Sequence, residues 1–254
     1  MGQVRTVRVT VPATTANLGP GFDCLGLALE LRNAFTLSAE GWKGEPDETG
    51  LVVTADGEGS RTLAKDGDNL VYRAAQAVFA RAGRHPAALH IHVDCRIPLG
   101  RGLGSSASAI VGGVWGAAAL LGEAGTTAEL LALAAELEGH PDNVLPAALG
   151  GFTVAVPGSG GQALRWVRVG TGENLRAVLA VPSFSLRTSE ARRRLPRQVP
   201  FGDAVFNVGR TAALVAAAVQ GDWLSAAAAM EDRLHQPYRA PLVPGFEGVC
   251  RAAR

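Results

Sequence analysis

The sequence is poor in cysteine and has no surplus of charge of either sign. Its three cysteines, Cys24, Cys95 and Cys250, are widely spaced and form no CxxC pair, which argues against a disulfide framework and a cysteine-based zinc site. Twenty-four basic and twenty-three acidic side chains leave a formal charge of +1, which provides no field to hold nucleic acid or an anionic membrane. We therefore expect small-molecule partners, no nucleic acid, no membrane, and a reducing, cytoplasmic location.

Signals for export and for membrane insertion are also lacking. Residues 1–11 interleave arginine with valine and place no apolar run after a basic stretch, so they do not resemble a secretory signal. The most apolar stretch, at 107–121, is shorter than the roughly 20 residues that a membrane span needs, and it predicts a buried helix. A chain of 254 residues can form two moderate domains, and we place their boundary near residue 170.

Hydrophobic periodicity predicts both strands and helices. In chain order we expect a strand at 7–11 that ends at Pro12, a shaped loop at 13–23, a solvent-facing excursion at 41–68 with a short strand at 51–53, a helix at 69–84 capped by Asp68 and closed by Gly83, a strand at 89–93, a helix from about 107, a helix at 126–137 that begins from Thr126 or Thr127, and strands within 150–169. A strand at 175–181 and helices at 205–220 and 223–234 then predict a second α/β unit.

The segment PLGRGLGSSAS, residues 98–108, carries the clearest chemical signal. Gly100, Gly102 and Gly104 let backbone amides approach an anion without obstruction from side chains, and the serines that follow supply hydroxyls. Because the segment opens onto the helix expected from about 107, free amides and the helix dipole face the same point. The pattern favours an anion-binding loop, and a glycine-rich turn that only caps a buried helix is the alternative.

Several other nucleotide-binding classes are disfavoured by what this loop lacks. It has no lysine and does not match the Walker pattern GxxxxGK[ST], and the chain has no HRD or DFG motif of protein kinases. Its glycines fall as GxGxG and not as the GxGxxG of dinucleotide-binding folds. The anion site therefore belongs to a different class.

Three segments together carry a family resemblance: PATTANLGPGFD at 12–23, PLGRGLGSSAS at 98–108 and EGHPDNVLPAALGGF at 138–152. The chain resembles the GHMP kinases, and among them the homoserine kinases. The serine-containing loop is shared by the whole superfamily, whereas the other two segments are more specific. The segments NLVYRA at 69–74, LRTSEAR at 186–192 and DRLHQPYR at 232–239 extend the resemblance.

The resemblance implies an α+β, two-domain GHMP kinase fold. Residues 1–170 would form the N-terminal α/β ATP-binding domain with mixed sheets, and residues 171–254 a ferredoxin-like C-terminal α/β domain. A third glycine-rich motif of the family, GxxxSGxGP, has no counterpart in the sequence, so we expect the second domain to be truncated. An exposed sheet edge would then favour association, for example as a homodimer.

The resemblance also implies that ATP and Mg²⁺ bind. Ser106 and Glu138 would be the catalytic residues that hold Mg²⁺, a sparse oxygen ligand set of the kind this ion takes; Glu136 is the competing carboxylate. Asn69 would lie near the adenine and Thr188 near the nucleotide, although Thr188 could equally cap a helix at 189–194. The phosphates would lie against Pro98, Leu99, Gly100, Arg101, Gly102, Leu103, Gly104, Ser105, Ser106, Ala107 and Ser108.

The implied acceptor, L-homoserine, presents an ammonium, a carboxylate and a hydroxyl, and it needs an acid, a bidentate cation and polar orienting groups. Alternatives are open at two positions: Arg192 begins a run of three arginines that could be plain surface, and His140 could be a structural histidine. By motif position the ammonium would meet Asn17 and Asp23, the carboxylate Arg192 and Arg239, and the remaining polar wall would be His140, Asp142 and Asn143.

The implied activity is transfer of the γ-phosphoryl group of MgATP to the homoserine hydroxyl, which gives O-phospho-L-homoserine for threonine biosynthesis. A loose transition state depends mainly on alignment and charge neutralisation, so we predict catalysis without a dedicated aspartate base. The alternatives are a GHMP kinase for another small alcohol, such as mevalonate or shikimate, and a GHMP-fold protein that binds ligands without transferring phosphate.

Overall fold

The structure is a computed structural model that describes residues 4–43, 50–122, 125–156, 158, 163–171, 175–184, 186 and 188–253. The strands are β1 (Arg5–Ala16), β2 (Leu25–Lys43), β3 (Gly50–Gly57), β4 (His85–Cys95), β5 (Phe152–Val156) and β6 (Arg165–Val169). The helices are α1 (Leu70–Ala82), α2 (Ser105–Leu121), α3 (Thr127–Glu138), α4 (Pro141–Leu149), α5 (Thr188–Arg193), α6 (Phe201–Gln220), α7 (Trp223–Ala228), α8 (Gln236–Arg239) and α9 (Phe246–Ala252), with short 3₁₀ helices η1 (Ser60–Thr62) and η2 (Ala240–Leu242).

The six strands form one sheet that is built around β2. The order is β3-β4-β2-β5-β6, and β1 also pairs with β2. Strand β2 is antiparallel to β1, to β4 and to β5, whereas β3 and β4 are parallel. Since β1 and β4 both run opposite to β2, their carboxyl ends lie at the same end of the sheet. The loops that follow these two strands, which carry two of the three family segments, are thereby brought together.

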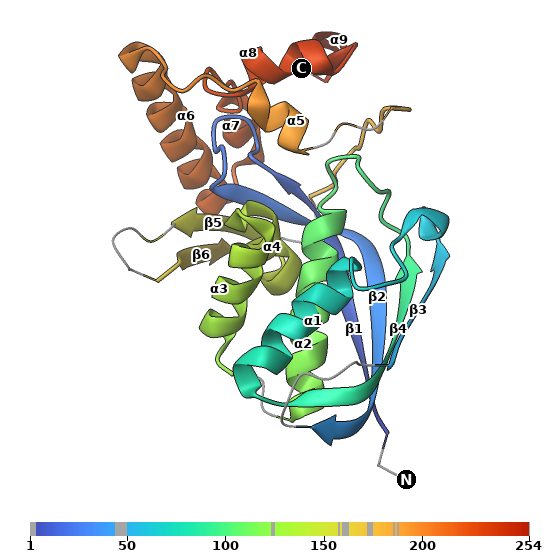
Figure 1. Ribbon diagram of the computed structural model, residues 1–254. Helices are drawn as coiled ribbons and strands as arrows, with labels where there is room; N and C mark the ends of the chain where they lie inside the picture. The colour runs from blue at the N-terminus through green and yellow to red at the C-terminus, as the bar shows by residue number, and fades with distance from the viewer. Residues whose placement is uncertain are drawn as a thin grey trace.

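Helices α1 to α4 cover one face of this sheet, as Figure 1 shows. The main core lies between these layers and is filled by fully buried side chains such as Phe35, Leu37, Phe79 and Ile91. The glycines of α2 allow unusually close packing, because a Cβ at Gly113 would lie 2.4 Å from the Val71 carbonyl oxygen of α1. The apolar stretch at 107–121 is therefore a buried helix, as predicted.

Helices α5 to α9 gather beyond one end of the sheet (Figure 1). A second buried cluster joins Leu214 and Ala218 of α6 to Leu25 of β2 and Phe152 of β5. This contact places the C-terminal helices against the loop that connects β1 to β2. No helix among the described residues is long and apolar enough to cross a membrane.

Several predicted element ends are wrong, among them the end of the helix expected at 223–234, which stops at Ala228. Strand β1 continues through Pro12 to Ala16, with a register shift between Pro12 and Thr14. Among the described strands β1 pairs with β2 alone, so Pro12, which has no N–H to donate, is tolerated at this edge strand beside a bulge. The cap of α1 is Asn69 and not Asp68, since the Asn69 side chain accepts from the amides of Val71 and Tyr72. The predicted C-cap at residue 83 and the start of α3 are confirmed.

Two strand predictions also fail. The 19-residue strand β2 was not predicted, and it spans both the 25–27 pairing with β5 and the 34–43 pairing with β4. The strand predicted at 175–181 does not form: the described residues 175–184 have no regular structure, and Val178 is 97% exposed. With no strand beside it in the described part of the chain, this segment cannot complete its backbone hydrogen bonds as a ladder.

Candidate functional site

The glycine-rich loop 98–108 has the backbone conformation of an anion-binding loop. Gly100, Gly102 and Gly104 have φ of 65°, 73° and 66°, a left-handed region that other residues adopt only with strain. Helix α2 begins at Ser105, and its N-cap residue, Gly104, has no side chain that could cap the first turn. The first amides of this 17-residue helix are therefore free for an anion.

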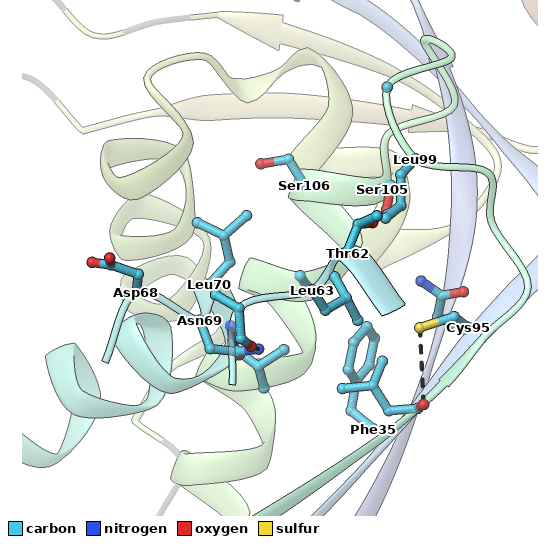
Figure 2. A pocket seen from close by; sticks show the side chains of 16 residues that line it. Phe35, Thr62, Leu63, Asp68, Asn69, Leu70, Cys95, Leu99, Ser105 and Ser106 are labelled. Atoms are coloured by element: carbon cyan, nitrogen blue, oxygen red, sulfur yellow. Dashed lines mark hydrogen bonds between the residues drawn. The ribbon is translucent and has the colours of Figure 1, made fainter. Parts of the chain in front are cut away.

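A cavity of about 290 Å³ lies beside this loop. Figure 2 shows the side chains of Phe35, Leu63 and Leu70 around it, with Ser105 and Ser106 at the start of α2 nearby. The buried Asn69 lines it and also caps α1, and its amide donates to the Ala64 carbonyl at 2.8 Å. The mostly apolar lining suits a nucleotide base. Residues 62–64, in the segment predicted to be a solvent-facing excursion, form part of its wall.

The segment before α5 contacts the phosphate loop. Arg101 donates from Nη2 to the Ser183 carbonyl at 3.1 Å, and the Leu186 amide donates to the Gly100 carbonyl at 3.4 Å. Thr188, which we expected near the nucleotide, is exposed and is the first residue of α5. The chain just before Thr188 thus lies against the loop, although the residues are more than 80 positions apart.

Ser106 and Glu138, predicted to hold Mg²⁺, lie together. The Ser106 hydroxyl donates to Glu138 Oε2 at 2.7 Å, across the gap between the start of α2 and the end of α3. The side chain of Glu138 is only 11% exposed. Burial raises the pKa of Glu138 above the usual carboxyl range, and the Ser106 hydrogen bond and the charge of His140 partly oppose this. The competing carboxylate, Glu136, points elsewhere and pairs with Arg81 at 3.1 Å.

The first turn of α4 supplies the predicted polar wall. His140 is the N-cap residue and Pro141 occupies the first turn, where proline is favoured. His140 Nδ1 lies 2.6 Å from Asp142 Oδ1, and its Nε2 lies 4.0 Å from Glu138 Oε1. The hydrogen bond to Asp142 raises the pKa of His140, and burial opposes it. Asn143 donates to Asp142 at 3.3 Å, so these side chains form one connected group.

The loop between β1 and β2 is held in a strained conformation. Asn17, Leu18 and Asp23 have φ of 69°, 44° and 57°, which is rare for residues with a Cβ and is concentrated at functional sites. The Asp23 amide donates to Asn17 Oδ1 at 3.1 Å, which closes the loop on itself. Both residues predicted for the substrate ammonium therefore lie on one short, shaped turn.

Asp23 and Arg192 are paired with each other. The guanidinium donates from Nη1 and Nη2 to both carboxylate oxygens, at 2.9 and 2.6 Å. We predicted them as separate ligands for the two charges of the substrate, and the geometry brings these ligands within reach of one molecule. The negative charges of Asp142 and Glu138 also act on Arg192. Arg239 lies nearby, and its pKa is lowered by burial and by the positive charge of Arg192.

A buried network that was not predicted fastens this loop to the C-terminal helices. Asn207 donates to the Pro20 carbonyl at 3.1 Å and to Asp232 Oδ1 at 2.7 Å. Asp232 accepts in turn from the amide of His235 at 2.9 Å, and His235 Nε2 lies 2.7 Å from the Gly19 carbonyl oxygen. The segment at 232–239 was part of the resemblance, but an asparagine on the long helix α6 gave no signal.

Comparison with known proteins supports the resemblance to the GHMP kinases. The model of the GHMP kinases N terminal domain matches residues 69–151. Homoserine kinases of Gloeobacter violaceus and Synechococcus sp. strain WH7803 are 48% and 47% identical over 247 and 249 residues, covering 96% and 98% of this chain and 80% and 78% of theirs.

Solved structures agree with these relatives. The crystal structure of homoserine kinase from Cytophaga hutchinsonii matches with a TM-score of 0.79 and 31% identity, over 98% of this chain and 78% of that one. Mevalonate diphosphate decarboxylase from Staphylococcus aureus matches with a TM-score of 0.61 at 15% identity, over 90% and 71%, which is a likeness of fold alone. The α+β GHMP kinase fold predicted from the motifs is confirmed, and the chain belongs to the homoserine kinase family of the GHMP kinases.

Proposed function

We infer that this protein is an ATP-dependent homoserine kinase, which transfers the γ-phosphoryl group of ATP to the side-chain hydroxyl of L-homoserine to give O-phospho-L-homoserine. The observation that carries the inference is the juxtaposition of a phosphate loop with the paired Asp23 and Arg192. Glu138 links the two, because it accepts from Ser106 of the loop and lies within electrostatic reach of Arg192. A substrate that is both a zwitterion and an alcohol fits such a site, and the similarity to homoserine kinases extends over nearly the whole chain.

The nucleotide would bind with its base in the cavity beside Asn69 and its phosphates on the loop at 98–108. The free amides at the start of α2 support this placement of the phosphates. Ser106 and Glu138 fit Mg²⁺, because they offer a hydroxyl and a largely buried carboxylate whose hydrogen-bond partner is neutral. When bound there, Mg²⁺ would supply the positive charge that neutralises the phosphates.

L-Homoserine would replace the internal contact between Asp23 and Arg192. Its ammonium would take Asp23 and the side chain of Asn17, and its carboxylate would take Arg192 together with Arg239. The Nε of Arg239 is buried without a hydrogen-bond partner in the described part of the chain, which supports an anion at this position. The group at 140–143 would line the side that faces the phosphates.

Phosphoryl transfer at this site would proceed without a dedicated carboxylate base. Each nearby carboxylate has an occupied role: Asp23 holds Arg192, Glu138 holds Ser106, and Asp142 holds His140. The protein would instead align the hydroxyl with the phosphorus and neutralise charge on the phosphate oxygens. Asp23→Asn should then raise the KM for homoserine more than it lowers kcat. An isolated collapse of kcat would assign Asp23 as the base.

The acceptor is tested by ADP release in the presence of L-homoserine, mevalonate, shikimate or no acceptor. We expect ADP release to exceed the background rate only when L-homoserine is the acceptor. Release that is the same with every acceptor and with none would favour a non-catalytic ligand-binding protein, and preference for mevalonate or shikimate would contradict the proposed substrate.

A further inference from the structure

Phe22, which none of the predicted site roles includes, lies at the centre of the substrate-binding arginines. The Arg192 guanidinium carbon is 5.4 Å from the centroid of the Phe22 ring, and that of Arg239 is 5.1 Å from it. Both distances are within the range in which a ring attracts a cation through its quadrupole. One aromatic side chain therefore contacts both guanidinium groups that would bind the substrate carboxylate.

Apart from their contact with this ring, the two arginines are held by different interactions. Arg192 has a two-point hydrogen bond to Asp23. Arg239 has no carboxylate within ion-pair distance among the described residues, and its Nε has no hydrogen-bond partner there. Burial lowers the pKa of Arg239, and repulsion by the like charge of Arg192 lowers it further. The ring of Phe22 is thus a direct contact shared by both guanidinium groups, and it adds to the more distant attraction of Asp23, Asp142 and Asp232 for Arg239.

The ring is itself fixed in place from the C-terminal segment. His235 stacks on Phe22 with ring centroids 5.1 Å apart and an angle of 32° between the planes, within the usual spacing for aromatic pairs. His235 is 5% exposed, and its Nε2 lies 2.7 Å from the Gly19 carbonyl oxygen. The ring therefore has a rigid neighbour that is anchored to the same loop.

We propose that Phe22 is a positioning residue that holds Arg192 and Arg239 side by side for the carboxylate of the substrate, and so contributes to selection of an amino-acid acceptor. The proposal rests on the proposed homoserine kinase function. Phe22 would not touch the transferred phosphoryl group. It would act through the two guanidinium groups, and only on substrates that carry a carboxylate.

The test compares two acceptors that differ only in this group. L-Homoserine and 3-aminopropan-1-ol share the hydroxyl and the ammonium, and the second lacks the carboxylate. In Phe22→Leu we expect kcat/KM for homoserine to fall by roughly 10-fold to 100-fold, the loss that one or two cation–π contacts in a desolvated site would give. The value for 3-aminopropan-1-ol, and the KM for ATP, should stay within about twofold, because neither involves the carboxylate contact.

Two further variants make the result specific. Phe22→Tyr keeps a π face and should restore most of the homoserine activity. Phe206→Leu is the matched control. The Phe206 ring centroid also lies near two guanidinium carbons, 4.9 Å from that of Arg210 and 3.9 Å from that of Arg233, but Phe206 is on α6 outside the site. Phe206→Leu should leave kcat/KM for both acceptors unchanged. If Phe22→Leu does not fold, Phe22→Met carries the same comparison with a more flexible apolar side chain.

The outcomes separate the two proposals. Equal losses for both acceptors in Phe22→Leu, or no loss for either, would overturn the positioning role while leaving homoserine kinase activity intact. Failure of the unaltered chain to phosphorylate homoserine, with no homoserine binding by calorimetry, would overturn the proposed function and the role of Phe22 with it.

Discussion

Replacing Asn207 by leucine tests whether the strained substrate loop depends on α6 for its stability. The Asn207 side chain is 2% exposed and makes three hydrogen bonds: two as a donor, to the Pro20 carbonyl and to Asp232, and one as an acceptor, from the Arg233 amide at 2.9 Å. Leucine has the same branching at Cγ, is larger, and can make none of these bonds. The substitution therefore removes the polar contacts, and any overpacking adds to the cost.

The expected cost follows from the character of these bonds. Two are bonds between neutral groups, worth about 1 kcal/mol each, and the bond to a carboxylate is worth about 2 kcal/mol. Asp232 keeps its backbone donors, and Pro20 keeps the Thr211 hydroxyl at 3.0 Å, so part of the loss is recovered. We expect Asn207→Leu to lower the free energy of unfolding by about 3 kcal/mol, and Tm by roughly 6 to 12 °C.

Urea denaturation followed by circular dichroism, with scanning calorimetry for Tm, measures this cost. Thr211→Val provides the matched comparison, because it removes one neutral hydrogen bond to the same Pro20 carbonyl and should cost about 1 kcal/mol. The folded fraction of Asn207→Leu should also show a raised KM for homoserine and an unchanged KM for ATP. A cost for Asn207→Leu no larger than that for Thr211→Val would refute the reasoning.

Three further predictions concern the phosphate loop, the metal site and a buried histidine. Gly104→Ala should raise the KM for ATP more than Gly102→Ala, because both glycines have positive φ but only at Gly104 would the new Cβ clash, 1.9 Å from a threonine oxygen; equal effects would contradict this. Burial raises the pKa of Glu138, so the affinity for Mg²⁺ in the presence of ADP, measured by calorimetry, should weaken as pH falls toward that raised pKa. Glu138→Gln should bind Mg²⁺ more weakly at every pH, with little pH dependence. Burial lowers the pKa of His235, so below about pH 6.5 the unfolded chain binds a proton that the folded chain does not; stability should fall as pH drops through this window, and less so in His235→Gln, as urea titrations at several pH values would show.

The local parts of this molecule were predictable from the sequence. The phosphate loop and the start of α2 follow from the order of glycines and serines, since the required backbone conformation and the free amides are properties of a few consecutive residues. The capping box of α3, formed by Thr126 and Glu129, was likewise visible as a short-range pattern. The pairing of Ser106 with Glu138 was reached only through the family resemblance.

The remaining features depend on contacts between distant parts of the chain. Asp23 and Arg192 are 169 positions apart in the sequence, so local patterns do not reveal their ion pair. Nothing in the sequence near Phe22 indicates that two arginines approach its ring. Strand β2 was missed because its buried residues do not keep a simple alternation: three consecutive positions, 33–35, are buried where β2 lies between β1 and β4. The prediction that β1 ends at Pro12 was wrong for the same reason, because the neighbouring strands decide how far a strand is paired.

The internal pair of Asp23 and Arg192 places in the site one negative and one positive charge, the same two kinds that the substrate brings. An arriving zwitterion exchanges one set of ion pairs for another, and the net charge of the site does not change. Added salt should therefore weaken homoserine binding only slightly, whereas it should weaken the binding of the highly anionic nucleotide much more. A site that keeps its own charges paired also discriminates by exchange: a ligand with only one of the two charged groups leaves either Asp23 or Arg192 without a partner.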